Sequence, residues 1–462
     1  MPAELGGGAI GRRELLRRSA QVGCGAAAMG VVGLAGSSTA AATRVSNPAK
    51  GVVLFGDPSF NFEALFALGG VAYGAGEVGE IIATANAINA RGLSYQSYVD
   101  EFLATARRVG RIADQALRAG HRASARSAYL RSAQYFDQAL FFILGTRTPG
   151  MERRLYALMQ RQWSRAAQLF DPPFERIAIP YGNTTLPGYF LKPDRSSIKR
   201  PTVIINNGSD AENVDVWAFG GAAAIERGYN ALIFEGPGQG STLFEREIPF
   251  RPDWEKVITP IVDYLHRRRD VDTKRIAMTG WSFTGELVIR AAAFEHRIAA
   301  VCADPGSVDT WLAYPASLRG LFAHGASQAE VNAIWTRDIA PHLSVAEHFL
   351  FAKRSEVFAR QFLRTARAGR LLTDFWTFGQ LASRYTNLDV IDRVRAPVLV
   401  TDYQLEQFYP GQATRLDSLL RSPKKLVTFT IAEGAEYHDA PMAPQRRNQV
   451  IFDWLDETLG IH

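Results

Sequence analysis

The 462-residue sequence contains very little cysteine, which limits how the fold can be held together. Only Cys24 and Cys302 are present. If an N-terminal segment is removed after Ala42, as argued below, one thiol remains and no internal disulfide can form. The Cys and His spacing also matches no zinc pattern. We therefore expect a large hydrophobic core to stabilise the protein without disulfides or a metal.

Long runs of like charge are also absent. The formal net charge is +6, and the sequence has no run of five or more basic residues. Nucleic-acid-binding proteins usually concentrate Lys and Arg on one face, so this partner class gains little support. The Gly-rich segments lack the Lys-Ser/Thr of a phosphate-binding loop and the acidic residue of a dinucleotide fingerprint.

The first 42 residues have the pattern of a twin-arginine export signal. The pair Arg12-Arg13 precedes an Ala/Gly/Val-rich stretch at 20–36, and small residues at 40–42 fit a cleavage site. We expect export in the folded state to a secreted or extracytoplasmic location. A retained membrane anchor is the weaker alternative because the apolar stretch is short, so no stable membrane association is expected after cleavage.

The next segment, 43–170, is predicted to be an N-terminal arm followed by a helical cap domain. Residues 43–62 are punctuated by Gly and Pro and predict an extended arm. Apolar residues then recur at helical spacing, for example in 98–109, with no clear strand. The aromatic residues of 135–142 are expected mainly in the core, with a pocket wall as the alternative.

Residues 171–462 predict a catalytic domain with an α/β fold. A β-hairpin at 175–191 is followed by alternating strands and helices. This order is typical of a mostly parallel, twisted sheet with helices on both faces, whose site lies at the carboxyl ends of the strands. Between about 305 and 395 the alternation stops, and dense aromatic residues predict a helical insertion that forms a second cap wall.

Ser282 stands between an apolar strand and a helix, where a sharp turn exposes a serine as a nucleophile. Residues two places away must be small because the backbones nearly touch there. Gly280 satisfies this need, whereas Thr284 stands where the usual pattern has its second glycine and Gly285 comes one place later. The match is imperfect, but the strand, turn and helix predict Ser282 as the nucleophile.

A serine nucleophile needs a base and an orienting acid, which follow it in the order acid, then histidine, on this kind of sheet. His438 lies in the loop after the last predicted strand and is the predicted base. The acid should follow the strand 397–401. We favour Glu406 by its place in that loop, and Asp402 at the strand end is the alternative acid.

A developing oxyanion needs two preorganised donors. The backbone N–H of Phe283 is one candidate. The other should come from the loop after the first central strand, at Ser209. The alternative for this loop is a polar turn in which Asp210 caps the next helix.

Several segments together carry a resemblance to a known family, namely 128–136, 207–210, 234–240, 280–283 and 433–438. They resemble the α/β-hydrolase group that contains 2,6-dihydroxypseudooxynicotine hydrolase and the fungal polyketide-shortening hydrolases. The resemblance implies an α/β-hydrolase fold, no cofactor, and a triad of Ser282, Glu406 and His438. Because a C–C hydrolase of this group has an assisting glutamate in its oxyanion loop, it also implies a substrate-assisting role for Asp210.

The resemblance implies cleavage of an ester or a ketone-adjacent carbon–carbon bond in a fairly apolar small molecule. An acyltransferase or lactone-forming enzyme with the same triad is one alternative, and a non-catalytic binding protein of this fold is another. The expected partner is the substrate, with no nucleic acid; a homodimer is left open. A peptidase with a propeller is disfavoured because no repeats precede the catalytic domain.

Overall fold

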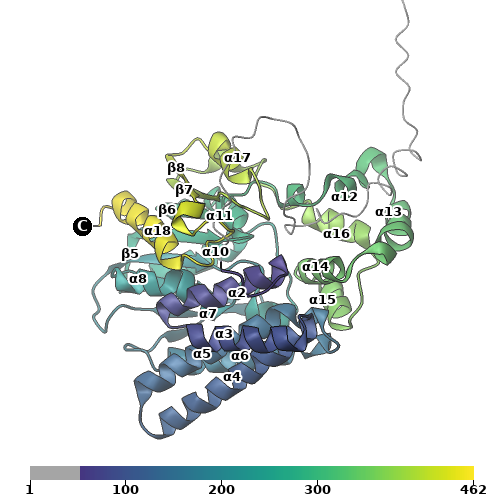
Figure 1. Ribbon diagram of the computed structural model, residues 1–462. Helices are drawn as coiled ribbons and strands as arrows, with labels where there is room; N and C mark the ends of the chain where they lie inside the picture. Colours follow the sequence, from purple (N-terminus) through teal and green to yellow (C-terminus); the bar gives the residue numbers. More distant parts are fainter. Residues whose placement is uncertain (1–51, 462) are drawn as a thin grey trace, which may run out of the picture.

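The computed structural model describes residues 52–461 and has an eight-stranded sheet at its centre (Figure 1). The strand order is β1-β2-β4-β3-β5-β6-β7-β8. The pairs β1/β2 and β2/β4 are antiparallel, and all other neighbours are parallel. The strands are β1 (Glu175–Tyr181), β2 (Thr184–Leu191), β3 (Arg200–Asn206), β4 (Asn230–Phe234), β5 (Val271–Trp281), β6 (Ala300–Asp304), β7 (Val398–Tyr403) and β8 (Lys424–Phe429). The predicted fold class is confirmed.

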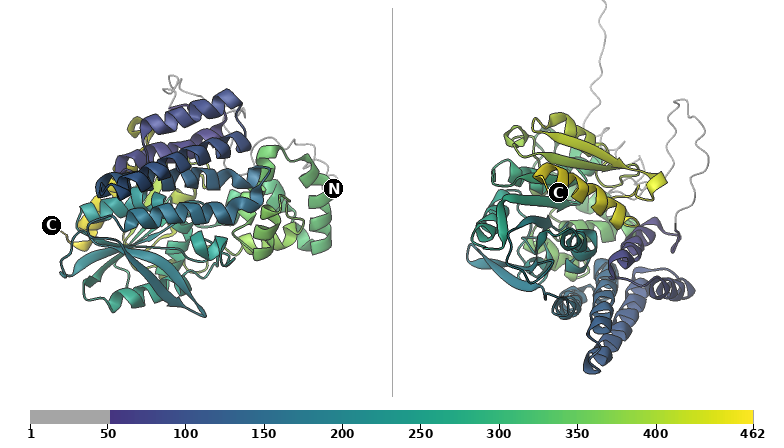
Figure 2. Two further views of the ribbon diagram at one scale, coloured as in Figure 1. Left: turned by 90° about the horizontal axis from the view of Figure 1, so that it is seen from below. Right: turned by 90° about the vertical axis from the view of Figure 1, so that its left-hand side faces the viewer.

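The hydrophobic pattern explains the order of the strands. All residues of β4 and β6 are buried, as expected for central strands covered on both faces, whereas most of β8 is exposed at the sheet edge. Helices pack against the sheet (Figure 2). They include α8 (Ala222–Glu226), α10 (Glu255–His266), α11 (Thr284–Ala292), α17 (Gln412–Leu419) and α18 (Pro444–Leu459).

Within residues 52–461, five α-helices precede the sheet and form a layer beside it, coloured purple to blue in Figures 1 and 2. They are α2 (Pro58–Gly70), α3 (Val78–Arg91), α4 (Tyr95–Arg118), α5 (Arg122–Phe142) and α6 (Glu152–Ala167). The predicted extended arm is wrong over residues 58–62, which already belong to α2. The physical reason is a strong helix start: the Asp57 carboxylate accepts the N–H of Ser59 at 2.8 Å, and Pro58 occupies the first helical position.

The segment between β6 and β7 is a helical insertion, as predicted. Its helices are α12 (Ala316–Gly320), α13 (Gln328–Ile334), α14 (Val345–Ser355), α15 (Arg360–Arg367) and α16 (Phe375–Ala382). Both α13 and α14 begin with a serine and glutamate capping box, which fixes their first turns. The insertion protrudes from the sheet edge, and α14 and α15 contact the N-terminal helical layer (Figure 1).

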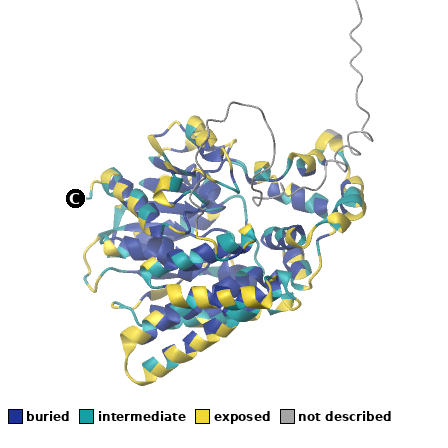
Figure 3. Ribbon diagram, viewed as in Figure 1, coloured by how far each residue is buried: buried dark blue, intermediate teal, exposed yellow. Residues whose placement is uncertain are grey.

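The core runs without interruption from the N-terminal helices through the sheet into the insertion (Figure 3). Its largest fully buried side chains include Trp163 in α6, Trp254 before α10 and Trp335 in the insertion. No helix within residues 52–461 has the length and apolar character needed to cross a membrane. The predicted export signal lies outside the described residues.

Candidate active site

A pocket of about 1050 Å³ lies where the helical layer, the insertion and the carboxyl edge of the sheet meet. Both helical regions contribute to its wall. Phe141 and Phe142, at the end of α5, line the pocket, whereas Tyr135 and Phe136 are buried in the core. Both alternatives that the sequence left open for the aromatic residues of 135–142 therefore apply: some lie in the core and others form the pocket wall. Other apolar wall residues are Phe62, Phe66, Phe349, Leu350 and Phe358.

Ser282 lies on the pocket wall at the turn between β5 and α11. Its φ is +54°, a left-handed value that non-glycine residues seldom adopt. The turn is held because the Ser282 N–H donates to the backbone oxygen of Asp304 at 2.7 Å. A Cβ on Gly280 would lie 2.2 Å from the backbone oxygen of Thr284, so only glycine fits there. This is the strained turn that the sequence predicted around the serine.

Thr284 strengthens this turn. Its side chain is fully buried, and Oγ1 accepts the N–H of Trp281 at 2.8 Å. The hydroxyl also lies 2.9 Å from the Trp281 carbonyl oxygen and 3.2 Å from that of Asn206. The residue that must be glycine is Gly285, one place after Thr284, because a Cβ on Gly285 would lie 2.1 Å from the backbone oxygen of Pro305. The threonine therefore replaces the usual second glycine without blocking the turn.

We expect Thr284→Val to lower the free energy of unfolding by about 1–3 kcal/mol, because the Trp281 N–H would lose its buried acceptor. Valine keeps the shape of threonine, so the change isolates the hydroxyl. Urea unfolding of the variant measures the effect, and Thr273→Val, at a half-buried position of β5, is the matched control. Equal stability of wild type and Thr284→Val would contradict this role.

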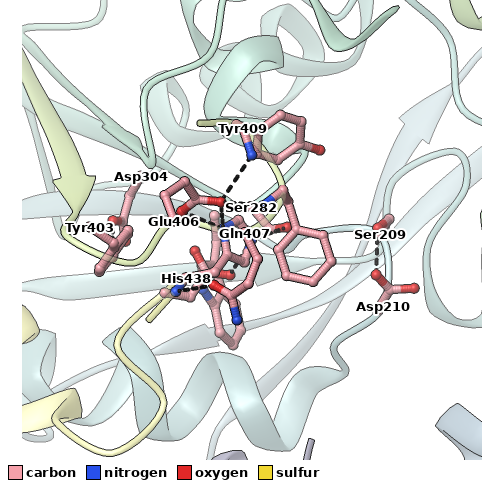
Figure 4. A network of polar contacts seen from close by, with 12 residues as sticks. Ser209, Asp210, Ser282, Asp304, Tyr403, Glu406, Gln407, Tyr409 and His438 are labelled. Carbon is pink, nitrogen blue, oxygen red and sulfur yellow. Dashed lines mark hydrogen bonds and ion pairs between the residues drawn. The ribbon is translucent and has the colours of Figure 1, made fainter. Parts of the chain in front are cut away.

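The structure brings Ser282, His438 and Glu406 into one hydrogen-bonded line (Figure 4). His438 Nε2 lies 2.8 Å from Ser282 Oγ, and Nδ1 lies 2.8 and 2.9 Å from the two Glu406 carboxylate oxygens. The side chains of His438 and Glu406 are only 4% and 3% exposed. Because Nδ1 faces a carboxylate, it carries the proton, and Nε2 is directed at the serine hydroxyl.

Glu406 is fixed by the loop that carries it. Its Oε1 accepts the backbone N–H groups of Phe408 and Tyr409 at 2.8 and 3.0 Å. The loop also holds the histidine, because Gln407 Oε1 accepts the His438 backbone N–H at 3.1 Å. The longer glutamate side chain can therefore orient the imidazole from a position beyond the strand end.

Asp402 is not brought to the histidine. It lies within β7, and its Oδ1 accepts the backbone N–H of the next residue, Tyr403, at 2.9 Å. Burial raises its pKa, since the backbone hydrogen bond compensates only in part. Strand β7 extends two residues past the predicted end at 401, which keeps Asp402 in the sheet.

The loop after β3 lies against the serine. A Cβ on Gly208 would lie 3.0 Å from Ser282 Cβ, so a larger residue would crowd the hydroxyl. Gly208 and Ser209 line the pocket together with Phe283. Among the described residues, the backbone N–H groups of Ser209 and Phe283 have no acceptor. The sequence did not single out Gly208, although a glycine in a loop after a central strand is a usual sign of close backbone approach.

The alternative prediction for this loop, that Asp210 caps the next helix, is wrong. Glu212 occupies the cap position of α7 (Asn213–Val216). Asp210 instead forms an ion pair with Arg354 of α14 and accepts a hydrogen bond from Ser209 Oγ at 2.8 Å. Burial opposes its ionisation, but Arg354 and Lys353 outweigh burial and lower the Asp210 pKa. The insertion thus holds a charged Asp210 at the pocket wall.

Three further carboxyl groups line the pocket, and the sequence did not reveal them. They are Glu63 on α2, Asp137 on α5 and Asp215 on α7. Burial, together with repulsion from Asp215 and Asp210, raises the pKa of Glu63 to about 8. Glu63 is therefore mainly protonated at neutral pH and can donate a hydrogen bond. Helical spacing predicted a helical cap around positions 63 and 137 without showing what these side chains would meet, and it gave no role to Asp215.

A second carboxylate approaches the histidine from its other side. Asp439 Oδ2 lies 3.2 Å from His438 Nε2, and Asp439 has a φ of +62°. Burial alone would lower the His438 pKa, but Asp439 and Glu406 outweigh it and raise the pKa to about 9. The sequence indicated only His438 in this loop, because an acidic neighbour is common in polar loops.

Comparison with known proteins gives consistent results. A family described as esterase FrsA-like matches residues 104–322. The α/β hydrolase psoB of Aspergillus fumigatus is 35% identical over 265 residues, which cover 54% of this chain but only 59% of psoB. The α/β hydrolase ucsC of Acremonium sp is 28% identical over 447 residues, covering 87% of this chain and 88% of ucsC.

Among solved structures, the crystal structure of 2,6-dihydroxy-pseudo-oxynicotine hydrolase matches with a TM-score of 0.61. The sequences are 19% identical, and the match covers 85% of this chain and 95% of that protein. At this identity the likeness shows a shared fold, and it extends across the helical layer as well as the sheet. Within residues 52–461, no group of three His, Cys, Asp or Glu side chains has the arrangement of a metal site.

Proposed function

We propose that this chain, which has the α/β-hydrolase fold and resembles hydrolases of that fold, is a cofactor-independent serine hydrolase that forms an acyl-enzyme at Ser282. The observation that carries the proposal is the unbroken line from Glu406 through His438 to the Ser282 hydroxyl. A protein that only binds a ligand has no need of a serine on a strained turn with a base 2.8 Å away.

In the proposed reaction, His438 Nε2 takes the proton of Ser282 as Oγ attacks the carbonyl carbon of the substrate. The negative charge that develops on the carbonyl oxygen is stabilised by the free N–H groups of Phe283 and Ser209. The imidazolium then returns the proton to the leaving oxygen or carbon as that bond breaks. Water, deprotonated by His438, releases the acid and restores Ser282.

The pocket supports an apolar acyl substrate with a few polar groups. Aromatic side chains from α2, α5 and the insertion contribute to the wall. The protonated Glu63 can donate to a substrate carbonyl, and Asp210, held by Arg354, lies beside the oxyanion loop where a substrate-assisting group would act. The wall fits an ester or a ketone-adjacent carbon–carbon bond; an alcohol in place of water would make the same acyl-enzyme an acyltransferase.

A fluorophosphonate probe tests the proposal directly. We expect the intact mass of the folded protein to increase by one adduct, located on Ser282 by peptide mapping. The adduct should be absent in Ser282→Ala. The matched control is Ser307→Ala, because Ser307 also lies near the carboxyl edge of the sheet but is buried, donates to Gln412 and does not line the pocket. A folded wild-type protein that takes up no probe would refute the serine mechanism.

The proposal includes export in the folded state, on the basis of the twin-arginine pattern in residues 1–42. A single buried thiol, Cys302, in residues 52–461 fits a mature enzyme without disulfides. The N-terminal sequence of the protein recovered outside the cytoplasm tests this part. A protein that keeps residues 1–42 and stays in the cytoplasm would contradict it.

A further inference from the structure

The loop that carries His438 places a second carboxylate on the imidazole, and the triad does not use it. Glu406 contacts Nδ1, whereas Asp439 Oδ2 lies 3.2 Å from Nε2, the nitrogen that faces Ser282. The Asp439 side chain is 4% exposed, and its other oxygen, Oδ1, has no hydrogen-bond partner among the described residues. A buried carboxyl group with an unpaired oxygen is costly to keep, so its position beside Nε2 calls for a functional explanation.

The backbone holds Asp439 in this place. Its φ is +62° and that of Ala440 is +48°, so two consecutive non-glycine residues are left-handed. Such residues cluster at functional sites, where the surrounding structure imposes the conformation. The turn is closed by the Ala440 N–H, which donates to the Tyr437 carbonyl oxygen at 2.8 Å. An extended backbone would direct the chain past the imidazole; this turn returns the carboxylate to it.

The other charged or titratable groups around His438 and Asp439 come from three elements, β6, β7 and α18. Asp304, at the end of β6, is buried and forms an ion pair with Arg447 of α18. Tyr403 of β7 donates to Asp304 Oδ1 at 2.5 Å. Arg447 is therefore occupied by Asp304 and does not form an ion pair with Asp439. Burial raises the pKa of Asp439 well above its usual range, and His438 opposes this effect, so Asp439 is ionised as the partner of the protonated imidazole 3.2 Å away.

We propose that Asp439 is a positioning residue for the proposed hydrolase reaction: its carboxylate stabilises the imidazolium from the Nε2 side and so shifts to alkaline pH the range in which His438 accepts the Ser282 proton. An opposite charge at this distance favours the protonated imidazole by about 1–3 pH units. The same carboxylate stabilises the imidazolium that forms as Ser282 attacks. The neutral imidazole of His438 is then a stronger base, but a smaller fraction of His438 is unprotonated at neutral pH.

This inference rests on the proposed function, and Asp439→Asn tests it. Asparagine has the same shape and is the non-glycine residue that best tolerates a left-handed φ. In the wild type, the rate of fluorophosphonate inactivation should rise with pH and level off above the His438 pKa, so this rising limb of the profile has its midpoint near pH 9. In Asp439→Asn we expect that limb to move at least one pH unit lower and the rate at its high-pH plateau to fall by about two- to tenfold. The two profiles should therefore cross.

A purely structural role would lower the whole profile without moving the limb, and that result would overturn the inference. Asp402→Asn is the matched control, because Asp402 lies near Glu406 but contacts neither ring nitrogen; its limb should coincide with that of the wild type. If Asp439→Asn does not fold, Asp439→Gly suits the same backbone and replaces it.

The ¹⁵N NMR titration of the His438 ring separates this inference from the proposed function, because it needs no reaction. We expect the His438 midpoint to fall by at least one pH unit in Asp439→Asn. An unchanged midpoint refutes the role of Asp439 whatever the probe does. A lowered midpoint in a protein that takes up no probe would support the charge pairing and refute the serine mechanism instead.

Discussion

His438→Ala is expected to reduce the hydrolysis of a simple activated ester by about 10⁴- to 10⁶-fold, the usual loss when a serine hydrolase loses its base. The variant loses Nε2, the atom 2.8 Å from Ser282 Oγ that is placed to accept the hydroxyl proton during attack. The initial rate of p-nitrophenol release from p-nitrophenyl acetate measures the effect. The rate of fluorophosphonate labelling should fall in parallel, because both reactions need the same activated oxygen.

The control for this prediction is His342→Ala. His342 lies in the helical insertion, is exposed and does not line the pocket, so its removal should change the rate by less than about twofold. Because His438 is buried, the variant must also be shown to be folded, for example by its near-ultraviolet circular dichroism. Substantial ester hydrolysis by folded His438→Ala would mean that another group is the base.

The second large effect is expected at the acid. Glu406→Gln should lower kcat by up to about 10⁴-fold, as loss of the orienting carboxylate does in related triads. A glutamine amide can donate to Nδ1 and would then favour the tautomer with its proton on Nε2, where it blocks proton transfer from Ser282. The kcat for p-nitrophenyl acetate, measured with saturating substrate, separates this effect from weaker binding.

Asp402→Asn provides the decisive comparison, because the sequence left the two acids open. Asp402 has no hydrogen bond to His438 and stays within β7, so we expect kcat to change by less than about threefold. A dead Asp402→Asn beside an active Glu406→Gln would reverse the assignment.

The sequence was sufficient to predict the fold class and to select Ser282, His438 and Glu406, which the structure joins by hydrogen bonds. Alternating strands and helices have a strong periodicity, and the order of serine, acid and histidine follows from the order of parallel strands. The sequence could favour Glu406 over Asp402 only by its position in the loop. The structure decides between them because β7 extends through Tyr403 and keeps Asp402 in the sheet. The end of this strand depends on its pairing with β8 rather than on the local sequence pattern.

Features that depend on contacts between distant segments could not be predicted. The charge on Asp210 is favoured by Arg354 of the insertion, and the raised pKa of Glu63 comes from burial and then from repulsion by Asp215 and Asp210. The start of α2 was missed for a local reason, since Asp57-Pro58 is also a common turn signal. From the sequence, Thr284 was a departure from the usual glycine, because a sequence pattern does not show which hydrogen bonds a side chain forms. In the structure, its hydroxyl accepts the Trp281 N–H and stabilises the turn.

Helix α2 has a consequence for the time at which the pocket forms. Its Gly69 leaves no room for a Cβ against the Pro441 oxygen, and its Phe62 ring lies 6.4 Å from that of Tyr437, so the first described helix packs on the loop of His438. During synthesis, α2 leaves the ribosome early and must wait for almost the whole chain before this surface exists. The part of the pocket wall between α2 and this loop is therefore completed only when the C-terminal part of the chain is available.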